Sequence, residues 1–69
     1  MSAVDDRIAE TVKLSRPAQR ALAEAGIVTF ADLAGWLRKD VAALHGIGPK
    51  SFVELDPAMA ARGLDYRAP

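Results

Sequence analysis

Apolar residues recur at helical spacing along most of the chain. After Ser15 they stand three or four positions apart, at Ala18, Ala21, Leu22 and Ala25. Ser15 is a favourable N-cap, and Pro17 falls in the first turn, where its missing N–H is harmless. Gly26 stands where a left-handed residue commonly ends a helix, and Ile27 follows as its hydrophobic contact. The pattern predicts a first firm helix over about residues 16–25.

Two shorter helices are predicted next. Thr29 is expected to cap the first of them, with Asp32 three residues later as a capping-box-like partner. The inward positions of this helix are Phe30, Leu33, Ala34 and Leu37. Asp40 is a plausible N-cap for the second, which would run only to Leu44. A helix of that length is unstable alone, so packing must hold it.

The last predicted helix begins at Pro49, again a first-turn position. Pro57 has no amide N–H, so it is expected to kink or break this helix. Asp56 before it can cap a fresh turn, and the helix is then expected to run on as a bent continuation. Gly63 should end the helix, with Leu64 as its packing contact.

No segment shows the alternation or the β-branched runs of a strand. The prediction is an all-α fold, a compact bundle of four to five short helices. With 69 residues the chain forms one small domain with a thin core. Residues 1–13 are expected to be partly flexible, with a short helix over about 7–13. The domain itself should span 14–66, followed by a tail at 67–69.

The composition restricts the kinds of binding site and cross-link that the chain can form. The chain has no Cys and one His, which excludes disulfides and makes a structural zinc site a poor expectation, and we expect no metal and no cofactor. No apolar run approaches the length of a membrane span. Asp5, Asp6 and Arg7 interrupt the stretch where a signal peptide would be apolar, so the expected location is cytoplasmic, with no membrane partner.

The segment His45-Gly46-Ile47-Gly48-Pro49-Lys50 carries the main chemical signal. Two glycines around an apolar residue permit a tight turn with positive φ. The helix that follows begins with amides that have no intrahelical partner and with the positive end of its dipole. Such a site accepts phosphate, with Lys50 adding charge and Ser51 a hydroxyl donor. The alternative is that the segment is only a glycine-rich turn between helices.

Charge adds a second group of candidates. The net charge is zero and the pI is about 6.5, without the basic excess usual in nucleic-acid-binding proteins. Lys13, Arg16 and Arg20 nevertheless follow one another with no acid between them, which allows a local basic patch. The candidate DNA-binding residues are Arg16, Arg20, Gly46, Gly48, Lys50 and Ser51. Their contacts would be to the nucleic-acid backbone, which carries little sequence information.

The sequence also resembles a known family. The segment from Leu44 to Lys50 is similar to the hairpin of helix-hairpin-helix DNA-binding proteins, and Ala25-Gly26-Ile27 weakly echoes it. From Leu14 to Leu64 the chain resembles, without a gap, the C-terminal domain of the bacterial RNA polymerase alpha subunit. The similar positions are Leu14-Ser15, Ala21-Leu22, Ala25-Gly26-Ile27, Thr29, Asp32-Leu33, Leu44, Gly48, Lys50-Ser51, Glu54 and Arg62-Gly63-Leu64. The resemblance implies a tandem helix-hairpin-helix, SAM-like arrangement.

That family binds upstream promoter DNA across the minor groove and contacts transcription activators. By position, Gly48, Lys50, Ser51 and Glu54 match its DNA face. Where the family has its principal DNA-reading arginine this chain has Pro17, and where it has a DNA-contacting asparagine this chain has Arg20. The resemblance with these departures implies weak, sequence-independent DNA binding. The chain lacks the polymerase assembly domain, so it resembles a free-standing bacterial relative, expected to be a monomer.

Two other classes of function are alternatives for this chain. A protein-interaction module of transcription or repair machinery would keep the fold and lose DNA binding, with Trp36, Phe52 or Tyr66 as anchors. An enzyme is disfavoured, because no paired carboxylates or nucleophile–base pair stand in a defined element, and no catalytic residue is assigned. His45 is expected to be a capping or surface residue.

Overall fold

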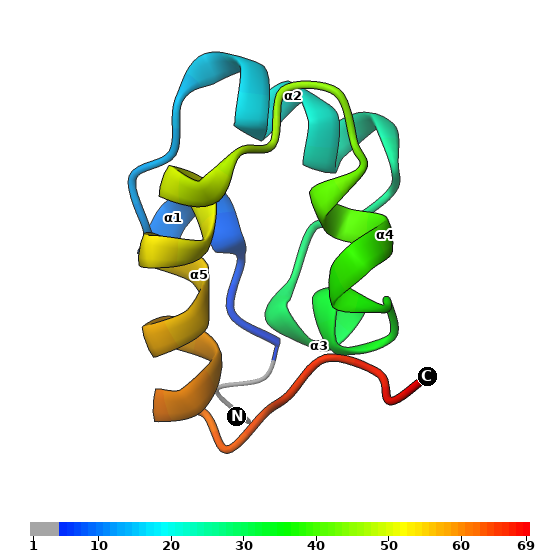
Figure 1. Ribbon diagram of the computed structural model, residues 1–69. Helices are drawn as coiled ribbons and strands as arrows, with labels where there is room; N and C mark the ends of the chain where they lie inside the picture. The colour runs from blue at the N-terminus through cyan, green and yellow to red at the C-terminus, as the bar shows by residue number, and fades with distance from the viewer. Residues whose placement is uncertain (1–4) are drawn as a thin grey trace.

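Helices supply the regular structure of this protein. The computed structural model describes residues 5–69, which form α1 (Ile8–Thr11), α2 (Arg16–Glu24), α3 (Phe30–Ala34), α4 (Arg38–Ala42) and α5 (Pro49–Ala61). α5 runs along one side, α2 crosses the top, and α3 and α4 lie opposite α5 (Figure 1). The described part contains isolated bridges but no strand, which confirms the all-α prediction. None of its helices is long and apolar enough to cross a membrane.

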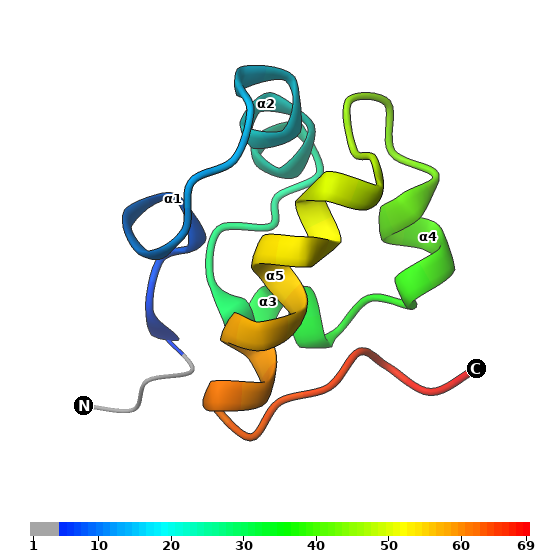
Figure 2. The ribbon, with the colours of Figure 1, turned by 60° about the vertical axis from the view of Figure 1, so that its left-hand side comes forward.

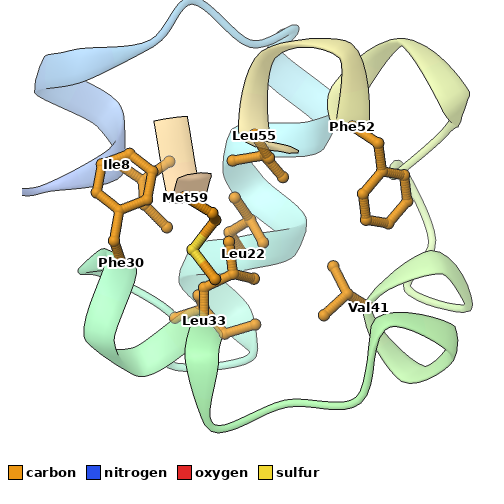
Figure 3. Close-up of a cluster of buried hydrophobic side chains, with 9 residues drawn as sticks. Ile8, Leu22, Phe30, Leu33, Val41, Phe52, Leu55 and Met59 are labelled. Atoms are coloured by element: carbon orange, nitrogen blue, oxygen red, sulfur yellow. The ribbon is translucent and has the colours of Figure 1, made fainter. Parts of the chain in front are cut away.

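One hydrophobic core joins all five described helices. Its most deeply buried large side chains are Phe30, Leu33, Val41, Leu55 and Met59. They come from α3, α4 and α5, and α1 and α2 add Ile8 and Leu22 to the same cluster (Figure 3). Burying one such side chain contributes about 1.5–3 kcal/mol. Helices this short are unstable alone, so the shared core holds them in place.

The predicted ends of α2 are confirmed. The hydroxyl of Ser15 accepts a hydrogen bond from the N–H of Ala18 at 3.3 Å, and Pro17 lies in the first turn. At the other end Gly26 has a φ of +79°, which places it in the left-handed region. The N–H of Ile27 donates to the carbonyl of Leu22 at 2.9 Å. This is the hydrogen bond of a Schellman motif that spans the larger number of residues.

The capping box at α3 is also confirmed. The hydroxyl of Thr29 accepts from the N–H of Asp32, and the Asp32 carboxylate accepts from the N–H groups of Thr29 and Val28, each at 3.0 Å. These two backbone N–H groups hold the pKa of Asp32 below its ordinary value, and the N–H of Thr29 has the larger effect. The start of α3 is therefore fixed by local sequence.

The predicted start of the next helix is wrong. α4 begins at Arg38, not after Asp40, and its N-cap Leu37 makes no side-chain capping bond. Tertiary contacts set this start instead. The Arg38 guanidinium donates to the Asp56 carboxylate at 2.8 Å and lies 4.1 Å from the centre of the Phe52 ring, while Val41 is fully buried.

The predicted break at Pro57 is likewise wrong, because α5 continues through it to Ala61. The carbonyl that loses a partner there belongs to Val53, whose residue is 70% exposed, so water can satisfy it. Asp56 does not cap a new turn. Its carboxylate accepts from Arg38 and from the Tyr66 hydroxyl, each at 2.8 Å.

The segment before α1 and the end of α5 meet beside α3. Arg62 donates to the Asp6 carboxylate at 2.9 Å, and its guanidinium lies 4.4 Å from the centre of the Phe30 ring. The carbonyl of Asp6 accepts from the N–H of Phe30 at 3.2 Å. Of the segment expected to be partly flexible, residues 1–4 lie outside the described residues, while Ile8 is in the core. α5 ends at Ala61 with Arg62 as its C-cap, and Gly63 follows in the left-handed conformation, with a φ of +66°, as predicted for the residue that terminates this helix.

Candidate nucleic-acid interface

The turn between α4 and α5 is closed by its own backbone. The N–H of Ile47 donates to the carbonyl of Leu44 at 3.1 Å, and Gly46, third in this four-residue turn, has a φ of +100°. A positive φ at that position is typical of a type II turn and favours glycine. Gly46 also approaches α2 closely, because a Cβ on it would lie 2.5 Å from the carbonyl oxygen of Pro17. The hairpin therefore packs against the start of α2. Both views of the ribbon place the loop before α5 beside α2 (Figures 1 and 2).

Gly48 differs from Gly46 in every respect that matters to the fold. Its φ of −134° and ψ of −178° are extended backbone that any residue adopts. A Cβ on Gly48 would meet nothing within 4 Å. Within residues 5–69 the N–H groups of Gly48 and Lys50 have no hydrogen-bond partner. The intramolecular contacts thus do not require glycine at 48, and glycine there leaves unpaired amides open to close approach.

Ser51 lies at the third position of α5 and is only 8% exposed. Its N–H donates to the carbonyl of Gly48 at 3.0 Å. Its hydroxyl has no hydrogen-bond partner among the described residues and is open to solvent, since no fully buried side-chain N or O atom of these residues lacks a partner. The remaining accessible part of this side chain faces a hollow in the surface.

We call this depression the hairpin hollow. It is lined by Lys13, Leu14, Ser15, Gly46, Gly48, Pro49, Lys50, Ser51 and Glu54. Four of the predicted site residues, from Gly46 to Ser51, are therefore brought together. The sequence-based set did not include Lys13, which reaches the hollow from the segment before α2. The sequence signal that could have identified Lys13 is its position in the run of basic residues with Arg16 and Arg20, which has no acid within it.

Arg16 and Arg20 lie in a neighbouring depression, which we call the arginine hollow. It is lined by Arg16, Pro17, Arg20, Ala21, Glu24, His45 and Gly46. The structure therefore does not place the two arginines in one site with Lys50. Gly46 lines both hollows, and its contact with Pro17 lies between them.

The two hollows form a positive face on a neutral chain. Their walls carry four basic residues against two carboxylates, while the rest of the chain carries five basic residues against seven. Ion pairs within residues 5–69 use Arg7, Arg38 and Arg62, all outside the hollows. None of the basic residues in the hollows forms an ion pair with a described residue, namely Lys13, Arg16, Arg20 and Lys50. Zero net charge thus coexists with an unneutralised basic surface.

Comparison with known proteins supplies no assignment. No family model matches the chain, and no curated protein matches it significantly. Within residues 5–69 no cluster of three or more His, Asp and Glu side chains could hold a metal ion. The functional interpretation therefore depends on the geometry and charge of the two hollows.

Proposed function

We propose that this protein is a small, non-enzymatic DNA-binding module that holds the phosphate backbone through a helix-hairpin-helix. Binding is weak and independent of base sequence. The observation that carries the proposal is the hydroxyl of Ser51, which has no partner among the described residues and lies at the edge of the hairpin hollow on a residue only 8% exposed. The unpaired amides of Gly48 and Lys50 belong to the same helix start.

These groups match the chemistry of a phosphate. Its oxygens accept from backbone N–H groups at a helix N-terminus, where the dipole also favours negative charge. Gly48 has no Cβ to hold the phosphate away, and a hydroxyl donor stands one turn into the helix at Ser51. Lys13 and Lys50 flank the hollow from two segments and supply charge-assisted bonds.

The lack of base readout follows from Pro17. The resembling family reads DNA with an arginine at this position, whereas Pro17 has no donor and its carbonyl packs against Gly46. The remaining basic groups suit phosphates, whose contacts position a protein without specifying a sequence. The module would work in a bacterial, cytoplasmic, transcription-related setting, in keeping with the resemblance.

The helix order supports a tandem helix-hairpin-helix arrangement. α2 and α3 are joined through Gly26, and α4 and α5 through Gly46, and both glycines have positive φ. The two turns are not identical. The first is a Schellman motif at the end of α2, while the second is a separate turn two residues beyond the end of α4. The second turn is the one that faces the basic surface.

Fluorescence anisotropy of a labelled duplex with the full chain tests the proposal. Three or four phosphate contacts predict a slope of log affinity against log salt of roughly −3. Lys50→Glu should lower affinity strongly, whereas Lys39→Glu, an equal charge change on an exposed residue outside both hollows, should lower it much less. Equal losses in the two variants would contradict a site at the hairpin.

A protein-interaction module is the second candidate, favoured by the outer face of α5. Val53 on that face is 70% exposed, and Pro57, Ala60 and Ala61 are exposed beside it. The anchors expected from sequence fit less well, because Phe52 is 7% exposed and Trp36 and Tyr66 pack partly against the core. Capture of a transcription or repair protein that survives Lys50→Glu and is lost with Val53→Asp would favour this candidate.

A further inference from the structure

We infer that a third hollow beside the hairpin receives an unpaired nucleobase, so that the preferred ligand is a DNA strand with unpaired bases. We call it the Arg38 hollow, and it is lined by Arg38, Ala42, Ile47, Gly48, Pro49 and Phe52. This subsite rests on the proposed function and deepens it, since a phosphate of the same strand would lie in the hairpin hollow.

The Arg38 hollow and the hairpin hollow meet at Gly48 and Pro49, which line both. Their chemistry differs. The hairpin hollow offers backbone amides, a hydroxyl and two lysines to an anion. The Arg38 hollow is otherwise apolar, and its one charged side chain is already paired with Asp56. A ligand that fills both hollows must carry an anionic group and a flat apolar group close together, as a nucleotide does.

The guanidinium of Arg38 forms a fixed, flat platform at this hollow. It donates to the Asp56 carboxylate at 2.8 Å, and its Cζ lies over the Phe52 ring, 4.1 Å from the ring centre. The Arg38 side chain nevertheless keeps 54% of its surface exposed. Guanidinium planes stack on nucleobases as they do on aromatic side chains. Because the group is already held in place, little side-chain freedom is lost when a base stacks on it.

The face of this guanidinium that points away from Phe52 is left for a ligand. Tyr66 is also near Arg38, with its ring centre 5.9 Å from Cζ. The ring centres of Phe52 and Tyr66 are only 6.0 Å apart. If Tyr66 lay across the guanidinium from Phe52, that distance would approach the sum of the two Arg38 distances. Tyr66 therefore lies to one side, and within residues 5–69 no third ring lies over Arg38.

The size of the hollow and the structure of DNA select the ligand. The Arg38 hollow has a volume of about 320 Å³, whereas a cavity of ~150 Å³ is enough for a benzene ring. A base in a duplex is paired and stacked inside the helix, so it reaches such a hollow only by leaving its pair. An unpaired base avoids that cost, and stacking accepts any base. We therefore expect a preference for unpaired strands without a preference for sequence.

Fluorescence anisotropy of the full chain with labelled oligonucleotides tests this subsite. Oligothymidylate is compared with an abasic strand of equal length, which carries the same phosphates. The base-bearing strand should bind roughly fivefold to one hundredfold more tightly. Both affinities should fall with salt while their ratio changes little, because the two strands release the same counterions. A duplex with a central run of mismatched thymines should likewise bind more tightly than a fully paired duplex of the same length.

Two substitutions locate the base. Ala42→Leu fills the Arg38 hollow from an exposed position at the end of α4, and it should bring the affinity for oligothymidylate close to that for the abasic strand. Ala43→Leu is the matched control, because it makes the same change on the next exposed residue, which does not line this hollow. It should keep the full ratio. Arg38→Lys keeps the positive charge but removes the planar guanidinium, so it should also reduce the ratio.

The possible results separate this subsite from the proposed function. Equal affinity for the base-bearing and abasic strands overturns the base subsite and leaves phosphate binding at the hairpin intact. A ratio that survives in Ala42→Leu, or falls equally in Ala43→Leu, overturns the subsite as well. No binding of any strand overturns the proposed function and the subsite together.

Discussion

The carbonyl oxygen of Pro17 lies only 2.5 Å from the point where a Cβ on Gly46 would stand. This approach brings the start of α2 against the hairpin before α5. It makes one surface from two segments that are far apart in the sequence. It also gives Pro17 a supporting role at a position where the resembling family carries its DNA-reading arginine.

Gly46→Ala should destabilise the fold by about 1–3 kcal/mol, because alanine would have to adopt a φ of +100° and displace the backbone of Pro17. For a domain of this size each kcal/mol lowers the melting temperature by about 4–8 °C. Thermal unfolding followed by circular dichroism measures the loss. A melting temperature equal to that of the unaltered chain would show that the close contact is not formed.

Gly48→Ala should leave the stability of the fold nearly unchanged and lower the affinity for DNA. The backbone at Gly48 is extended and a Cβ there meets no atom of the protein, so the fold should lose less than about 1 kcal/mol. Affinity for duplex DNA should fall, because the new methyl group holds a phosphate away from the amides of Gly48 and Lys50. Unchanged affinity in this folded variant would argue against phosphate binding at the start of α5.

Asp32 should make the domain sensitive to acid. Because the N–H groups of Thr29 and Val28 lower the pKa of Asp32 in the folded state, its stabilisation is present above the unfolded-state pKa and is lost as the pH falls through the folded-state pKa. Asp32→Asn should therefore lower the melting temperature at neutral pH and reduce its further fall in acid. Asp40→Asn serves as the control, since Asp40 accepts no hydrogen bond from a described residue. Equal acid sensitivity of the unaltered chain and Asp32→Asn would contradict this account.

Tyr66 should make the domain sensitive to alkali. Burial first, and then the hydrogen bond to Asp56, raise the pKa of Tyr66 well above its ordinary value. The folded state therefore keeps the phenol neutral, and its stabilisation is full below the unfolded-state pKa of about 10 and is lost as the pH rises above it. Tyr66 is the chain's one tyrosine, so ultraviolet absorbance reports its ionisation directly. Ionisation near pH 10 without unfolding would contradict the contact, and Tyr66→Phe should cost about 1 kcal/mol.

Local signals in the sequence predicted much of the fold. The capping box of Thr29 and Asp32 and the left-handed Gly26 are each specified by residues within one turn, so local sequence determines them. The errors at Asp40 and Pro57 have their cause in the tertiary structure, in a distant contact at α4 and in solvent exposure at α5. Arg38 reaches across to Asp56 to set the start of α4, and α5 continues past Pro57 because the carbonyl left without a partner, that of Val53, is on an exposed residue.

The candidate site was predictable only in part. Gly46 and Gly48 look alike in the sequence, yet only Gly46 is required by the fold, because only it touches Pro17. The separation of Arg16 from Lys50 by that contact depends on how two helices pack, which no local pattern encodes. The position of Lys13 in the hairpin hollow likewise depends on how the segments pack.

Amide shifts of the ¹⁵N-labelled full chain, titrated at low salt with a short duplex, test the central claim most directly. The account predicts shifts at Gly46 to Ser51 and at Lys13, which disappear as salt is raised and leave α3 and the C-terminal tail unchanged. Absence of shifts at Gly46 to Ser51, or shifts confined to the outer face of α5 around Val53, would contradict DNA binding through the hairpin.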